Sequence, residues 1–228
     1  KGVYTQSDEK FPYFVTKFIH GNLVADPLSK GRIFPLQMSM EIIKNILQGL
    51  SHIHSIGLLH NDITPRNIIY NPKDLSQTTL IDLGHVSKVN PDVISFEISD
   101  LTSLYRAPET YDNVYDKRTD IYSIAAVLYS MLFGKAPWHT SIAKGDNMSS
   151  AKMKDIMLER LSFSGGIDKC PSWLQSVLKL CLSYDPNCRI QSVDELLDAL
   201  NNECCPNIET SVAKTEAETC EIKSKENT

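Results

Sequence analysis

The spacing of apolar residues along the chain predicts a mainly helical domain. Aliphatic residues recur every three or four positions from Met38 to His54, the pattern of an amphipathic helix, and Gly57 is placed to end it. From Thr119 to Phe133 apolar residues occupy nearly every face, so we expect a buried helix capped by Thr119. Further helices are expected over 152–161, 172–182 and 193–200, the last capped by Ser192.

Short strands are predicted at two places. Phe11–Ile19 is rich in aromatic and β-branched residues and is typical of a strand. Residues 67–70 and 78–81 flank the turn-forming segment 71–74, which favours a β-hairpin. Residues 84–105 show no periodicity and are expected to form a long loop. The expected fold class is therefore α+β and mainly α-helical.

Composition limits the domain organisation. The 228 residues can bury one substantial core, which we expect over 1–200, followed by a polar, disordered tail over 201–228. The net charge of −5, from 23 basic and 28 acidic residues, gives no overall basic field for nucleic acid. The longest apolar stretch, Ile121–Phe133, is too short to cross a bilayer.

The cysteines and the first residues bear on the cellular context. Six cysteines show no C-x-x-C pair and no metal-ligand spacing, so free thiols in a reducing, intracellular (cytoplasmic) compartment are expected. The chain begins with Lys1 rather than Met, and its first residues do not form a secretory signal. We therefore expect a fragment of a longer protein.

Three separated segments carry groups suited to phosphoryl transfer. His60–Asn67 places Asp62 five residues before Asn67, Asp82-Leu83-Gly84 follows a predicted strand, and Ala107-Pro108-Glu109 follows a loop. Asp62 can accept a proton from a hydroxyl, while Asn67 and Asp82 offer the hard oxygen ligands that Mg²⁺ prefers. Each segment alone is weak evidence for phosphoryl transfer, but the three segments in this order are specific evidence for it.

The order and spacing of these segments resemble the C-terminal lobe of eukaryotic-type protein kinases, from the interlobe hinge to about residue 200. The resemblance implies ATP and Mg²⁺ as cofactors and a protein substrate. It implies that Asp62 is the catalytic base, with Arg66 and Thr102 also catalytic, and that Asn67 and Asp82 bind the metal. It further implies that Asp120 holds the catalytic loop from beneath and that Glu109 forms a buried ion pair with Arg189.

The resemblance also extends to the hinge. The segment 14–19 is similar to the strand that enters the kinase hinge, with Thr16 at the gatekeeper position. Lys17, Phe18 and Ile19 would then offer backbone groups to adenine, and Ile69 would pack under the base. Without the motifs, Thr16 and Ile69 would be interpreted as ordinary core residues.

Several positions depart from the family pattern. Asn61 stands where an arginine usually reads a phosphate on the activation loop, which implies activity that does not depend on that phosphorylation. Thr64 replaces a lysine typical of serine/threonine kinases, and Arg66 is typical of tyrosine kinases, whereas the segment from Thr102 to Tyr105 favours serine/threonine specificity. No G-x-G-x-x-G or Val-Ala-x-Lys segment occurs, so the N-terminal lobe is missing and we expect the isolated piece to be inactive.

Two alternatives stay open on the sequence alone. A pseudokinase or scaffold that binds protein partners is favoured by Asn61 and Thr64 and opposed by the intact Asp62, Asn67 and Asp82. A small-molecule kinase is opposed by the peptide-docking segment around Glu109. The pair His52 and His54 does not share a helix face, so it is not expected to bind a metal.

Overall fold

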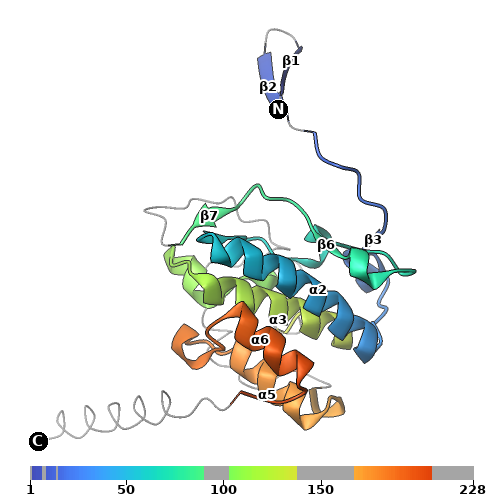
Figure 1. The fold of residues 1–228 in the computed structure, drawn as a ribbon, viewed down its shortest axis with the longest axis vertical. Helices are drawn as coiled ribbons and strands as arrows, with labels where there is room; N and C mark the ends of the chain where they lie inside the picture. The colour runs from blue at the N-terminus through green and yellow to red at the C-terminus, as the bar shows by residue number, and fades with distance from the viewer. Residues whose placement is uncertain (1, 7–8, 14, 90–102, 138–166, 207–228) are drawn as a thin grey trace, which may run out of the picture.

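The coordinates are those of a computed structural model, which describes residues 2–6, 9–13, 15–89, 103–137 and 167–206. The fold is α+β and mainly helical, as predicted (Figure 1). Its α-helices are α1 (Ala25–Ser29), α2 (Leu36–Ser55), α3 (Lys117–Phe133), α5 (Ser172–Cys181) and α6 (Val193–Asn201). Short 3-10 turns lie at Pro65–Asn67, Leu75–Gln77, Ser103–Tyr105, Pro108–Asp112, Ile167–Lys169 and Pro186–Cys188.

Helix α3 is the central element of the core. It contacts α2, α5 and α6, and every residue from Thr119 to Leu132 is buried (Figure 1). The prediction that Thr119 caps this helix was wrong. The N-cap is Asp116, whose carboxylate accepts from the backbone N–H of Arg118. The hydroxyl of Thr119 accepts from the backbone N–H of Asp116. The two side chains act reciprocally as a capping box, so α3 begins two residues before Thr119.

Helix α2 confirms the long amphipathic helix and extends it slightly at both ends. Its buried side chains include Ile43, Leu47 and Leu50, which face α3 and α6. Gly57 follows the helix with a φ of +77°, and its N–H donates to the carbonyl of His54 at 3.2 Å. A glycine adopts this left-handed conformation without steric cost, which explains why the helix ends there.

Short antiparallel strands lie along one side of the helical body (Figure 1). The predicted hairpin is confirmed: β5 (Ile68–Tyr70) pairs with β6 (Thr79–Leu80), and β3 (Asn22–Leu23) adds a third strand on the other edge of β5. A separate pair joins β4 (Leu58–Leu59) to β7 (Ser87–Lys88). This second pair holds the segment after Asp82 against the segment before His60.

Gly21 lies where the chain enters β3. A Cβ atom added there would meet the carbonyl oxygen of Tyr70 at 2.6 Å and the side chain of Ile69 at 2.7 Å. Only a glycine allows the two backbones to approach this closely.

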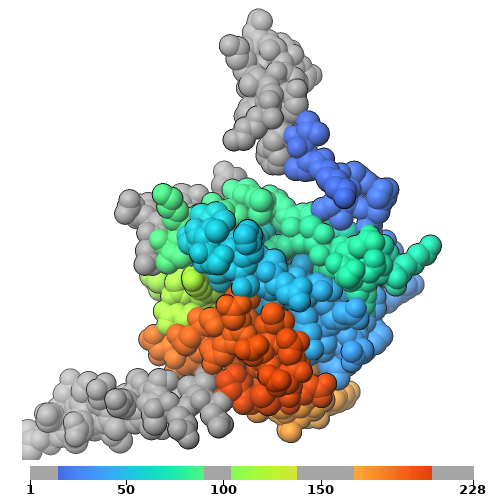
Figure 2. All heavy atoms as spheres, viewed as in Figure 1, coloured from blue at the N-terminus to red at the C-terminus, as the bar shows by residue number. Residues whose placement is uncertain are grey.

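The strand expected over Phe11–Ile19 was wrong in its position. The strand is β2 (Glu9–Tyr13), which pairs with β1 (Gly2–Gln6), and residues 15–20 form no strand. Val15 and Phe18 are 83% and 76% exposed, and the segment projects from the helical body in Figure 2. A strand needs a partner for its backbone groups, and within the described residues the partner lies beside 9–13 rather than beside 15–19.

The remaining predicted elements have mixed outcomes. The helices over 172–182 and 193–200 are confirmed as α5 and α6, and the Ser192 hydroxyl accepts from the N–H of Glu195 at the start of α6. The expected helix over 152–161 lies outside the described residues, as do residues 207–228 of the expected tail. In the part of the chain that the structure describes, no helix has the length and apolar character needed to span a bilayer.

Candidate active site

Asp62 and Asn67 meet at the two ends of one loop. The loop closes through a 3-10 turn over Pro65–Asn67, with Pro65 at its first position. The Asn67 side-chain N–H₂ donates both to the backbone carbonyl of Asp62 at 2.8 Å and to its Oδ2 at 2.7 Å. This orientation turns the amide oxygen of Asn67 away from the carboxylate, where it can serve a cation.

Asp120 holds this loop from below, as the resemblance implied. The residue is fully buried at the start of α3, and its Oδ1 and Oδ2 accept the backbone N–H groups of Asn61 and His60 at 2.9 and 2.8 Å. Oδ2 is also 2.9 Å from Nε2 of His54. The buried charge is therefore surrounded by donors, which is the condition under which burial is tolerated.

Asp82 lies close to the same loop. The N–H of Ile81 donates to the backbone carbonyl of Asn67 at 2.8 Å, so one hydrogen bond joins the first predicted metal ligand, Asn67, to the residue before the second, Asp82. Burial lowers the pKa of the His60 imidazole, and the negative charges of Asp120, Asp62 and Asp82, the largest named first, oppose that shift. The carboxylates of Asp62 and Asp82 therefore act on one imidazole.

Asp82 and Gly84 share the turn that follows β6. Asp82 itself has a positive φ of 65°, a region that aspartate tolerates better than most residues. Gly84 contributes by donating its N–H to Oδ1 of Asp82 at 3.0 Å, and a Cβ atom on Gly84 would come within 3.0 Å of that same oxygen. Gly84 therefore leaves room for the exposed carboxylate.

The donor set fits magnesium. Within the described ranges, no group of three or more His, Cys, Asp or Glu side chains is arranged to enclose a metal ion. Magnesium does not need such a cage, because it is commonly held by one or two protein oxygens together with substrate phosphates and water. Asn67 and Asp82 supply an amide oxygen and a carboxylate of that kind.

The predicted hinge residues line a hollow that ends at Asp82. Its volume is about 530 Å³, and its walls are formed by residues 16–19, Ile69 and residues 80–83. This size lies within the range of sites for small organic ligands. The structure thus brings Thr16, Lys17, Phe18 and Ile19 together with Ile69 and Asp82, although the four hinge residues do not form a strand.

Asn61 and His85 connect the catalytic loop to the segment after Asp82. Asn61 has a φ of 64°, and its side-chain N–H₂ donates to the carbonyl of His85 at 2.8 Å and to the hydroxyl of Ser87 at 2.9 Å. Nδ1 of His85 lies 3.5 Å from Oδ2 of Asp62. Sequence reasoning interpreted His85 as a loop residue only; its position three residues after Asp82 was the available signal.

The predicted ion pair between Glu109 and Arg189 is confirmed. Two nitrogens of the guanidinium donate to the two carboxylate oxygens at 2.6 and 2.7 Å, and Arg189 is fully buried. Its other donors reach the backbone carbonyls of Ser183, Tyr184 and Arg118, and its charge lies over the ring of Tyr122. The arginine therefore joins the segment after the active-site loops to the start of α6.

The other predicted catalytic residues lie differently. Arg66 is exposed and lines a second pocket beside the catalytic loop, whereas Thr64 is buried. Thr102 lies outside the described residues. The pair His52 and His54 is split as expected, because His52 is exposed while His54 is buried against Asp120.

Comparisons with known proteins agree with this geometry. The family model for the protein kinase domain matches residues 1–200. The chain is 30% identical over 175 residues to serine/threonine-protein kinase 16 of Rattus norvegicus, covering 71% of this chain and 53% of that protein. It is 26% identical over 219 residues to a probable serine/threonine-protein kinase of Clostridium perfringens, covering 95% and 31%.

A third relative is the serine/threonine-protein kinase TIO of Arabidopsis thaliana, 26% identical over 177 residues that make up 77% of this chain and 12% of that protein. The chain thus spans between about one eighth and one half of the length of these relatives. The family model covers residues 1–200, which is most of the chain. The chain belongs to the protein kinase domain family.

Proposed function

We propose that this chain is the catalytic lobe of an ATP-dependent protein kinase that phosphorylates serine or threonine residues of a protein substrate. The observation that carries the proposal is the position of Asn67. Its side chain holds Asp62, and its backbone carbonyl holds the residue before Asp82. A proton acceptor and two oxygen ligands are thereby fixed around one short link, which is the arrangement that phosphoryl transfer needs.

Each residue then has a distinct task. Asp62 accepts the hydrogen bond of the attacking hydroxyl and takes its proton. Asn67 and Asp82 would hold Mg²⁺, which when bound neutralises charge on the phosphates. The hollow lined by residues 16–19 and Ile69 would hold the adenine, with its apolar walls against the base and the hinge backbone groups at its edge.

Specificity for serine and threonine is supported by the relatives, whose names all describe serine/threonine kinases. Arg66 is the residue that favours tyrosine instead. Analysis of the phosphorylated amino acids in a peptide mixture separates the two, because serine or threonine acceptors are expected to carry nearly all of the label.

The experiment uses the full-length protein, labelled ATP and a degenerate peptide mixture. We expect magnesium-dependent transfer of label to peptide, and we expect Asp82→Asn to lower it at least about 100-fold, since the substitution removes the charge that holds the cation. Asp74→Asn, an exposed aspartate in the hairpin turn, is the matched control. Transfer that persists undiminished in Asp82→Asn would refute the assigned role.

A scaffold without catalysis is the second candidate, favoured by Asn61 at a position where the family usually has arginine. The same protein decides between the two. A scaffold would give no transfer to any peptide or partner, with or without Mg²⁺, whereas a kinase transfers label.

We also propose that the protein works in a reducing, intracellular compartment. The five cysteines in the described residues are all free, and Cys181 is buried in the core. Thiol labelling of the unfolded protein after rapid acid quenching of cells should find these cysteines reduced. Recovery of a stable disulfide among them would contradict the proposal.

A further inference from the structure

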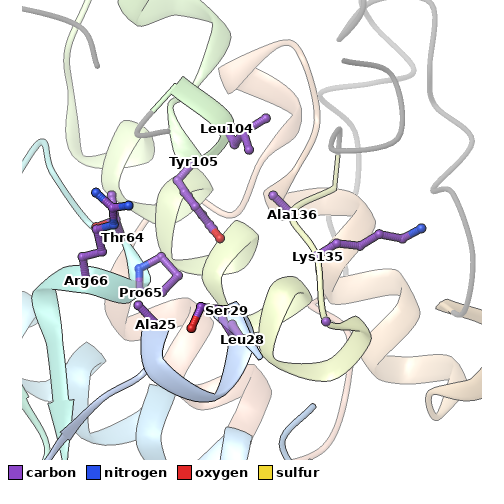
Figure 3. A pocket seen from close by; sticks show the side chains of 11 residues that line it. Ala25, Leu28, Ser29, Thr64, Pro65, Arg66, Leu104, Tyr105, Lys135 and Ala136 are labelled. Atoms are coloured by element: carbon purple, nitrogen blue, oxygen red, sulfur yellow. The ribbon is translucent and has the colours of Figure 1, made fainter. Parts of the chain in front are cut away.

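A second cavity lies beside the catalytic loop and is lined by different residues from the hollow described above. Its volume is about 280 Å³, and it is formed by α1, the segment Thr64–Arg66, the 3-10 turn at Ser103–Tyr105 and the end of α3 with the residues that follow (Figure 3). Asn67, which holds Asp62, is the next residue after this segment. The cavity therefore shares one wall with the site of transfer.

The lining of this cavity combines an apolar floor with positive charge. Leu28, Pro65, Leu104 and Ala136 supply the apolar surface, and none of the described residues that line the cavity is a carboxylate. Two cationic side chains, Arg66 and Lys135, lie on opposite sides of it in Figure 3, with the ring of Tyr105 between them. This local excess of positive charge contrasts with the net charge of −5 for the chain.

Neither cation is neutralised by the parts of the chain that the structure describes. No ion pair there joins Arg66 or Lys135 to a carboxylate, although Arg118 and Arg189 each have one. Arg66 is close enough to Tyr105 that its charge opposes the increase that burial causes in the pKa of the phenol. The charge of Arg66 thus acts on Tyr105, another residue that lines the cavity.

We propose that this cavity binds a segment of the protein substrate that carries an aspartate or glutamate near the accepting hydroxyl, with an apolar residue beside it. This inference rests on the proposed function, because it takes the occupant to be the polypeptide whose hydroxyl meets Asp62. An extended polypeptide advances about 3.3 Å per residue, so residues two to four positions from the acceptor reach about 7 to 13 Å from it. Charge complementarity and the apolar floor together select the acidic and apolar pair.

The first test measures phosphorylation by the full-length protein of peptides with one serine in an alanine background. Aspartate is placed in turn at each of the four positions on either side of the serine, and lysine is placed there in a parallel series. We expect aspartate at one or two positions to raise kcat/KM about three- to tenfold over alanine, and lysine to lower it. The preference should weaken in 0.5 M salt, because the charges are partly exposed.

Charge reversal assigns the preference to this cavity. Lys135→Glu and Arg66→Glu should each remove most of the preference for aspartate and improve the lysine peptides. Lys73→Glu makes the same change of charge in the exposed hairpin turn and should leave the preference intact. Equal preference for aspartate in Lys135→Glu and in the parent protein would overturn the proposal.

A binding measurement separates this inference from the proposed function. Fluorescence polarisation of the preferred acidic peptide, without ATP, should show tighter binding to the parent protein than to Lys135→Glu. Phosphorylation without any acidic preference overturns the cavity proposal and leaves the kinase assignment standing. Binding that depends on the aspartate of the peptide, without phosphorylation, would overturn the kinase assignment and leave the cavity proposal standing. If phosphoserine peptides bind and aspartate peptides do not, the cavity recognises phosphate and the proposal is wrong.

Discussion

Two sets of carboxylates in this lobe differ in exposure and in what their loss should cost. Asp120 is fully buried, Glu109 faces a fully buried arginine, and both are held by several donors. Asp62 retains 18% of its side-chain exposure, and Asp82 is exposed. The buried set positions the loops, and the accessible set is available for ligands. Removing the first should therefore cost stability, whereas removing the second should cost activity.

The largest effect is expected for Asp62→Asn. The amide keeps the size of the carboxylate but accepts no proton, so the rate of transfer by the full-length protein should fall about 10²- to 10⁴-fold. The free energy of unfolding should change by less than about 1 kcal/mol, because the group is partly exposed. Steady-state rates and denaturant unfolding measure the two quantities. A large loss of stability would show that Asp62 has a structural role like that of Asp120 and Glu109, and would contradict the distinction between the buried and the accessible carboxylates.

Glu109→Ala should show the opposite behaviour. It leaves the charge of Arg189 buried without its carboxylate, and breaking such a pair costs about 3–5 kcal/mol. The midpoint of urea unfolding measures this loss. Glu109→Gln keeps two polar atoms near the guanidinium and should lose less, so it serves as the matched control if the alanine variant does not fold. Identical midpoints for Glu109→Ala and the parent would refute the structural role.

Substitutions of Asn61 test whether its side chain holds the catalytic loop to the segment after Asp82. Asn61→Ala removes two hydrogen bonds and replaces asparagine with a residue that tolerates a positive φ less well, so we expect a loss of about 1–3 kcal/mol in unfolding free energy. Asn61→Gly removes the same bonds but tolerates the backbone, and the difference between the variants isolates the cost of the conformation. Stability equal to the parent in both variants would show that the link contributes nothing.

The smallest effect concerns pH. Burial lowers the pKa of His60, so between its folded pKa and the ordinary histidine value of 6.5 the unfolded state binds more protons than the folded state. Stability should therefore fall as pH decreases from about 6.5, by at most about 1.4 kcal/mol per pH unit from this group. His60→Gln should be less stable than the parent at pH 7, and the gap should narrow toward pH 5. A gap that is constant with pH would exclude His60 as the source.

Much of the fold and site could be predicted because local patterns determined it. The periodicity from Met38 to His54 identified α2, and the turn residues at 71–74 identified the hairpin. The ion pair between Glu109 and Arg189 was expected from the resemblance to protein kinases. Neither residue indicates an ion pair alone, and only the whole set of motifs does. These features depend on neighbours in sequence or on segments with strong signatures.

The rest depended on contacts that no local pattern encodes. The strand at the start of the chain was misplaced because strand formation depends on a partner, and Gly2–Gln6 had no comparable signature. Thr119 was predicted as the cap instead of Asp116. Both residue types are common helix caps, and only the reciprocal hydrogen bonds in the structure show which of the two is the N-cap. His85 was overlooked because its approach to Asp62 requires β7 to pair with β4.

The close packing at Gly21 has a consequence for whatever precedes the lobe. With no room for a side chain between this residue and Tyr70, the entry to β3 acts as a fixed pivot on the rim of the hairpin. Any larger residue would push the incoming chain outward and displace residues 16–19, which line the hollow that ends at Asp82. The shape of that hollow therefore depends on a position outside its lining.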